Sequence, residues 1–126
     1  MKTFTTSLSV DDAIEKLKSG VEAQNMRVVA HINGQANAAK IGKTVPGDQI
    51  LEIFRPDFAI RVWEACKPAG HDIPLRIHVY EEAGVTTVAC RMPTEVFEPF
   101  SSPELMAVGT ELDEIFNGIL ETVSES

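Results

Sequence analysis

The chain has 126 residues, of which 44% are hydrophobic and 24% charged, so we treat residues 1–126 as a single domain with one core. No apolar run approaches the roughly 20 residues of a transmembrane helix, and residues 1–10 lack the apolar centre of a secretory signal. Provided that no signal has been removed, we expect a cytoplasmic protein with no membrane partner. Cys66 and Cys90 are then expected as free thiols, although the sequence leaves a disulfide open.

The net charge of −8 is unevenly distributed along the chain. From Met92 onward there are eight acidic residues and no Lys or Arg, whereas residues 1–91 are balanced. One interpretation is a solvated helix face, and the other is an acidic surface that docks on a basic one, for example in a second copy. No basic patch stands out, so nucleic acid is not an expected partner.

The first two thirds of the chain alternate between strand and helix patterns. Ser9 begins a capping sequence for a helix that should end near Asn25, a residue type that tolerates the left-handed conformation. Asp57 is the candidate N-cap of a later helix that follows Pro56. The predicted ranges are strands at 2–8, 26–32 and 50–54, helices at 10–24 and 57–66, and a short helix at 35–41.

Residues 73–92 predict a β-hairpin, because apolar and polar residues alternate on both sides of Ala83-Gly84. With that two-residue loop, one face of the hairpin is apolar and includes Cys90. The other face places Arg76 opposite Arg91. Like charges directly opposite each other destabilise a sheet, so we expect an acidic neighbour. The candidates for this acidic neighbour are Glu64, Glu81, a C-terminal acid, a partner chain and an anionic ligand.

The C-terminal part predicts an ordered crossover at 93–101 and then a long helix, with Ser102 as N-cap and Pro103 at its first position. Seven apolar residues form one stripe along this helix. The element order favours an α/β (α+β) fold, a two-layer sandwich whose five-stranded sheet is mainly antiparallel and carries its helices on one face. The stripe consists of Leu105, Val108, Leu112, Ile115, Phe116, Ile119 and Val123.

The candidate ligand-binding residues lie on the other, open face of the sheet. They are Arg76, His78, Tyr80 and Arg91. Two arginines and a histidine can hold a carboxylate or phosphate through charged hydrogen bonds. The plainer interpretation is that acids of the same chain neutralise them, or that they lie in a dimer interface.

No catalytic motif is present. The cysteines and histidines have neither Cys-x-x-Cys nor His-x-x-x-His spacing, so we expect no metal and no other cofactor. Cys90 fits the buried face of its strand. Cys66 falls late in a helix, where the helix dipole disfavours a thiolate.

Four segments form a recognisable series along the chain: 11–14, 38–42, 50–54 and, most clearly, 73–81, Ile-Pro-Leu-Arg-Ile-His-Val-Tyr-Glu. Through these segments the chain resembles the domain of unknown function 302 family over roughly residues 5–120. Two departures are Gly34, where that family often has a His, and the altered turn at Phe54-Arg55-Pro56. The resemblance implies a compact α/β domain that is often dimeric, and it carries over no catalytic residue.

These observations favour a non-enzymatic binding module, expected to be a homodimer, that takes a small anionic ligand or a protein partner on its open sheet face. The alternative is a redox or metabolic accessory enzyme that uses His78 with Arg76 and Arg91, either with or without Cys90. A purely structural module is the third hypothesis.

Overall fold

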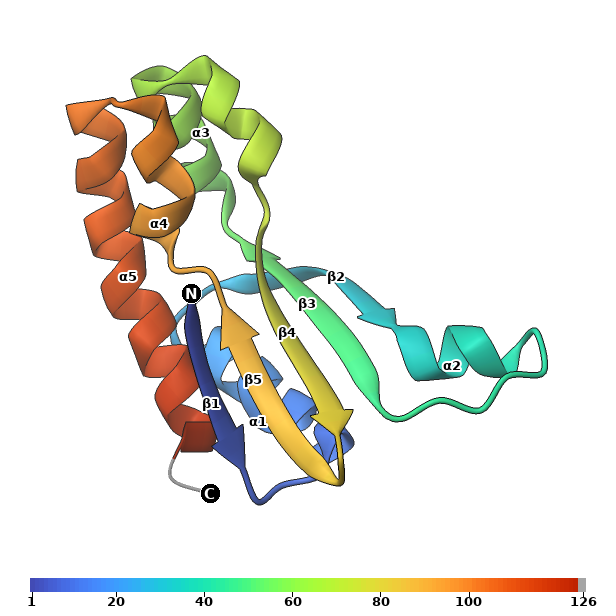
Figure 1. Ribbon diagram of the computed structural model, residues 1–126. Helices are drawn as coiled ribbons and strands as arrows, with labels where there is room; N and C mark the ends of the chain where they lie inside the picture. Colours follow the sequence, from blue (N-terminus) through green and yellow to red (C-terminus); the bar gives the residue numbers. More distant parts are fainter. Residues whose placement is uncertain (125–126) are drawn as a thin grey trace.

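The computed structural model describes residues 1–124. The fold is built around a five-stranded sheet (Figure 1). The strand order is β1-β5-β4-β3-β2, and every neighbouring pair is antiparallel. This confirms the predicted α/β fold with a mainly antiparallel sheet. The strands are β1 (Lys2–Thr6), β2 (Arg27–Asn33), β3 (Asp48–Phe54), β4 (Leu75–Glu82) and β5 (Val85–Cys90).

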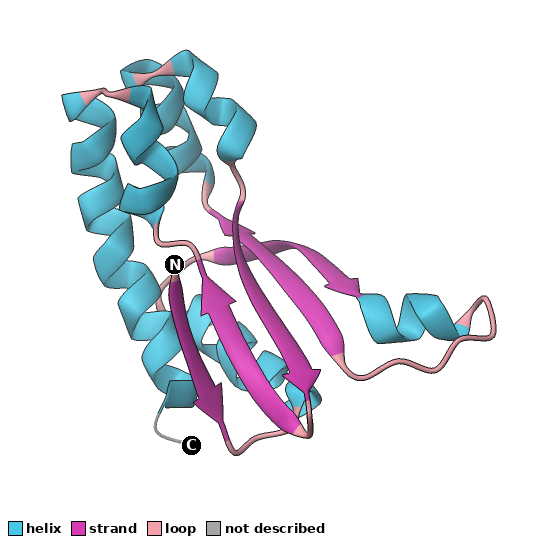
Figure 2. Cartoon of the chain, viewed as in Figure 1, coloured by secondary structure: helices cyan, strands magenta, loops and turns pink. Residues whose placement is uncertain are grey.

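The two long helices, α1 and α5, pack on one face of the sheet, and α3 and α4 lie beyond one end of it (Figures 1 and 2). The segment 34–47, which we call the arm, leaves the body between β2 and β3 and projects away from it (Figure 1). The helices are α1 (Val10–Ala23), α2 (Gly34–Ala39), α3 (Pro56–Ala65), α4 (Pro93–Phe97) and α5 (Pro103–Ser124), with 3₁₀ turns η1 (Lys67–Asp72) and η2 (Glu98–Phe100).

Local signals explain where the long helices begin and end. The Ser9 hydroxyl accepts a hydrogen bond from the Asp12 amide at 3.1 Å, as an N-cap does. Asn25 follows α1 with a left-handed φ of 57°. The Ser102 hydroxyl likewise accepts from the Leu105 amide at 3.2 Å, so these predicted helix ends are confirmed.

The start of α3 corrects one prediction. Arg55, not Asp57, is the N-cap, because Pro56 occupies the first helical position and Asp57 falls in the first turn. There the Asp57 carboxylate accepts a hydrogen bond from Arg55 Nε at 2.7 Å. That bond holds the pKa of Asp57 below its usual value.

The core lies between the helices and the sheet. The apolar stripe of α5 is buried as predicted, except that Ile115 is only partly buried. In α3, Phe58 and Val62 are buried, whereas Trp63 is 44% exposed. Residues 93–101, predicted as a crossover, fold into α4 and η2 and bury Phe97.

The hairpin has the predicted register. Ile77 pairs with Cys90 and Val79 with Val88. Both loop residues take positive φ, 52° at Ala83 and 78° at Gly84, which is the backbone of a tight two-residue hairpin turn. The alternation along β4 and β5 therefore places one set of side chains in the core and the other on the open face.

No helix within residues 1–124 is long and apolar enough to span a bilayer.

We expect Phe116→Ala to lower the free energy of unfolding by about 3–5 kcal/mol, because it leaves a cavity in the centre of the core. Phe116 is fully buried, whereas Ile60 is 50% exposed. Ile60→Ala is therefore the matched control and should cost less than about 1 kcal/mol. Urea denaturation followed by circular dichroism measures both, and equal losses would contradict this account of the core.

Candidate functional site

One row of side chains crosses the open face of the sheet at its middle. Thr3 pairs with Ala89, Ala89 with His78, His78 with Ile50, and Ile50 with Ile32. His78 is half-buried in this row. The polar residues predicted from sequence lie on either side of it.

Arg76 pairs with Glu52 of β3, and its Nη2 lies 3.3 Å from Glu52 Oε2. Glu52, whose side chain is only 20% exposed, therefore neutralises Arg76. The sequence had suggested Glu64, Glu81 or a C-terminal acid as the neutralising acid of the chain, and none of these pairs with Arg76 within residues 1–124. β5 ends at Cys90, so Arg91 lies beyond the ladder, and the expected like-charge pair does not form within the sheet.

His78 is held by two neighbours. Its Nε2 lies 2.9 Å from Asp48 Oδ1, and its ring centroid lies 4.7 Å from that of Tyr80. Because a carboxylate only accepts hydrogen bonds, Nε2 carries the hydrogen and Nδ1 is the acceptor when the ring is neutral. Asp48 thus fixes the orientation and the tautomer of the imidazole.

A pocket of about 700 Å³ opens beside this row. It lies between the open face, η1 and α4. Three of the four predicted ligand-binding residues line it, namely Arg76, His78 and Arg91, and Tyr80 stands outside it against His78. The apolar part of the lining comes from Met1, Ile50, Ile73, Pro74, Ala89, Val96 and Pro99, among others.

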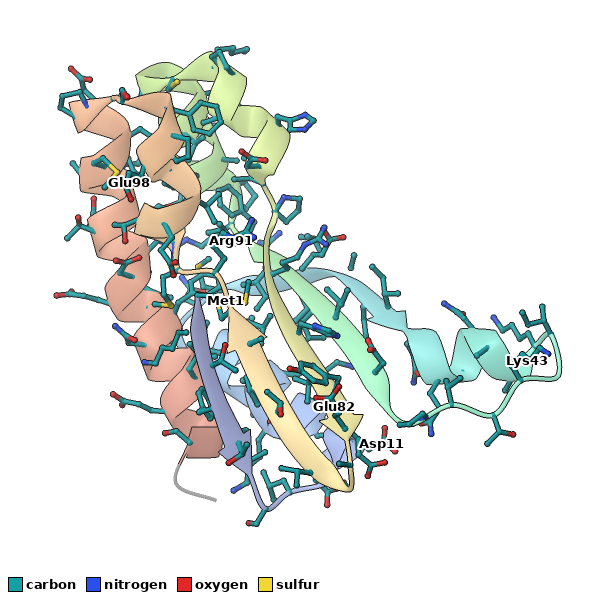
Figure 3. The ribbon with its side chains drawn as sticks, viewed as in Figure 1. Met1, Asp11, Lys43, Glu82, Arg91 and Glu98 are labelled. Atoms are coloured by element: carbon teal, nitrogen blue, oxygen red, sulfur yellow. The ribbon has the colours of Figure 1, made fainter. Side chains whose placement is uncertain are left out.

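Arg91 is exposed at the rim of the pocket, next to Met1 (Figure 3). Within residues 1–124, its guanidinium forms no ion pair. The nearby acid Glu95 is engaged by the amino group of Met1 at 2.5 Å and by the Met92 amide at 3.0 Å. These hydrogen bonds, and to a smaller degree the charge of Arg91, lower the pKa of Glu95.

The two cysteines lie away from this pocket. Cys90 points into the core with 1% of its surface exposed. Burial, with a smaller contribution from Glu95, raises the pKa of its thiol to about 12. Cys66 is also a free thiol. No cluster of histidine, cysteine and carboxylate side chains suited to a metal ion occurs in the described part of the chain.

Asp48 and Glu52 are the site residues that sequence reasoning missed. The signal was the alternation of β3, in which Asp48, Ile50 and Glu52 share the open face while Leu51 and Ile53 are fully buried. The alternation shows which side chains share a face. It does not show that β3 lies beside β4, so their partners could not be assigned.

The fold and this site together define a two-layer α/β domain with one open sheet face and a pocket at its edge. The chain belongs to the family described as Domain of unknown function DUF302, whose model matches residues 2–123. The predicted family resemblance is thereby confirmed.

The fold is similar to the crystal structure of an uncharacterized conserved protein DUF302 from Bacillus stearothermophilus. The TM-score is 0.86 at 21% sequence identity, and the match covers 97% of this chain and 96% of that one. At this identity the likeness concerns the fold alone. No curated protein matches the chain.

We expect Cys90 to resist thiol reagents in the folded protein. With a pKa of about 12, the thiolate fraction at pH 8 is on the order of one in ten thousand, and burial blocks access as well. In a Cys66→Ser variant, Ellman's reagent should react with Cys90 only after urea is added. Rapid reaction of the native variant would contradict this expectation and favour a redox role.

Proposed function

We propose that the protein binds a small anionic ligand in the pocket beside the open sheet face. The observation that supports this most directly is Arg91, whose guanidinium lies at the rim of a pocket lined by both polar and apolar residues. Within residues 1–124 it has no ion-pair partner. A guanidinium offers a planar set of donors that matches a carboxylate or phosphate. A ligand anion would satisfy it.

The pocket suits an anion that also has an apolar part. Its volume of about 700 Å³ falls in the range of small-molecule sites, and its lining combines apolar with charged side chains. Ile50, Ala89 and Val96 line it, and they would contact the apolar part while Arg91 holds the charge. The ligand would therefore be a carboxylate or phosphate ester with an aliphatic or aromatic portion.

His78 would supply the second polar contact. Asp48 occupies Nε2, which leaves Nδ1 to accept a hydrogen bond from the ligand when the ring is neutral. Arg76 contributes less than the sequence suggested, since Glu52 already pairs with it. The site thus depends mainly on one arginine rather than on a clamp of two.

The alternative proposal is an accessory enzyme, and the observation that favours it is the same Asp48–His78 contact of 2.9 Å. A carboxylate that orients an imidazole is an arrangement used in general base catalysis. The redox version is less well supported, because Cys90 is buried and its thiol has a pKa of about 12.

We also propose, as the sequence suggested, that the protein is a homodimer and that it is cytoplasmic. A protein partner on the open face is the alternative occupant of the pocket region.

We expect benzoate to bind the wild type and to bind Arg91→Ala on the order of 10- to 100-fold more weakly, because a charged hydrogen bond is worth about 1.5–3 kcal/mol. Chemical-shift titration measures both affinities, and the backbone amides of Ala89 and Val96 should shift. Phosphate and methyl benzoate, tested in parallel, separate the contribution of the charge from that of the apolar part.

Two matched variants make this test specific. Arg27→Ala removes the same charge from β2, away from the pocket, and should leave binding unchanged. Arg76→Ala should weaken it by less than Arg91→Ala, because Arg76 is shared with Glu52. Equal affinities of the wild type and Arg91→Ala would overturn the proposed site.

A further inference from the structure

The arm, residues 34–47, is ordered without a core of its own. Its helix α2 has six residues and no buried side chain, and isolated helices this short are unstable in water. Asn33 caps it by accepting from the Ala36 amide at 2.9 Å, and Gln35 Nε2 donates to the Val45 carbonyl at 3.1 Å. These few polar contacts bury almost no apolar surface, so the arm is a segment that packing against another surface would stabilise.

The chemistry of the arm is apolar and basic. Ile41 is 76% exposed and Val45 is 36% exposed. Lys40 and Lys43 are its charged residues, and it contains no acid. Neither lysine forms an ion pair with any residue in the range 1–124. The arm therefore suits an acidic surface that includes an exposed apolar residue.

Such a surface exists on this chain, at the end of the sheet where α1 and β3 begin and the β4–β5 hairpin turns. Gln49 Nε2 donates to Asp11 Oδ1 at 2.7 Å and the Glu81 amide donates to the Gly47 carbonyl at 2.9 Å, so these segments lie side by side. Val85 pairs with Glu82 across the hairpin and is 45% exposed, so this surface includes an exposed apolar residue. We call this surface the acidic end; its acids are Asp11, Asp12, Asp48, Glu81 and Glu82.

The arm does not use the acidic end of its own chain. Lys43 lies at the tip of the arm, well away from Asp11 and Glu82 (Figure 3). We propose that the arm of one copy docks on the acidic end of a second copy, and that the second arm docks on the first in the same way. This inference names the interface of the homodimer proposed above and rests on it.

The positions of the two surfaces favour a closed pair. The arm joins β3 next to the acidic end, so both surfaces lie on the same side of the molecule and a two-fold axis can form both contacts at once. Helix α5, which carries most of the acidic residues of the C-terminal part, lies on the other side of the molecule from the arm (Figure 1). If the arm docked on α5 of a second copy, the contact would be head-to-tail. Repeated head-to-tail contacts build either a closed ring or an open filament, not a two-fold dimer.

The test is a charge swap with the full chain. Lys40→Glu/Lys43→Glu should raise the dissociation constant of the dimer on the order of 100-fold, because each like-charge contact occurs twice. Glu81→Lys/Glu82→Lys should weaken the dimer in the same direction but by less, because Asp11, Asp12 and Asp48 remain on the acidic end. Mixed in equal amounts, the two variants should associate more tightly than either does alone, since one contact of the mixed pair keeps the native charges and the other sets the glutamates at 40 and 43 against the lysines at 81 and 82. Sedimentation equilibrium at low salt measures all three samples.

The control variant Lys16→Glu/Lys18→Glu makes the same change of charge on α1 and should leave the dimer intact. Ile41→Asn should weaken it and Ile60→Asn, at another exposed isoleucine, should not. Circular dichroism checks that each variant is folded.

The outcomes separate the two proposals. A wild type that stays monomeric up to about 100 μM would overturn the homodimer and this interface together. A dimer that survives both charge reversals, or a mixture that fails to associate, would overturn the interface and leave the homodimer standing. The benzoate titration is independent of either outcome.

Discussion

The pairing of β3 with β4 is the constraint on which the open face depends. Its register places Asp48 beside Tyr80, Ile50 beside His78 and Glu52 beside Arg76. A slip of one residue would send Asp48 and Glu52 towards the core and bring Leu51 and Ile53 to the open face. The apolar residues of β3 therefore hold the register, and the polar residues between them receive their partners from it.

The same register explains why the two arginines behave differently. Arg76 lies within the ladder, where a neighbouring strand can supply an acid, and Glu52 does so at 3.3 Å. Arg91 follows the last paired residue of β5, where no strand lies alongside it to supply an acid. The hairpin register was predicted correctly, but the ladder ends at the Ile77–Cys90 pair, so the expected conflict between Arg76 and Arg91 does not arise within the sheet. One arginine is paired on the open face and the other lies at the pocket rim.

Helix caps and the hairpin turn could be predicted from the sequence, whereas contacts between residues far apart in the chain could not. The Ser9 and Ser102 caps, the turn at Ala83-Gly84 and the hairpin register depend on residues close together in the chain, so their patterns sufficed. The contact between His78 and Asp48 spans 30 positions. The error at Asp57 has a local cause as well: Pro56, which fixes φ at the first helical position, was assigned to the loop.

The comparison with the solved Bacillus stearothermophilus structure shows why a shared fold does not specify a ligand. A TM-score of 0.86 at 21% identity requires only that the apolar alternation, the helix stripes and the turns be compatible with one backbone, since core volume and patterning are what a fold needs. The side chains of Asp48, His78 and Arg91 lie outside that requirement, because they point away from the core or follow a strand end. The binding function proposed above depends on these outward positions, and charge substitutions there should leave the fold intact.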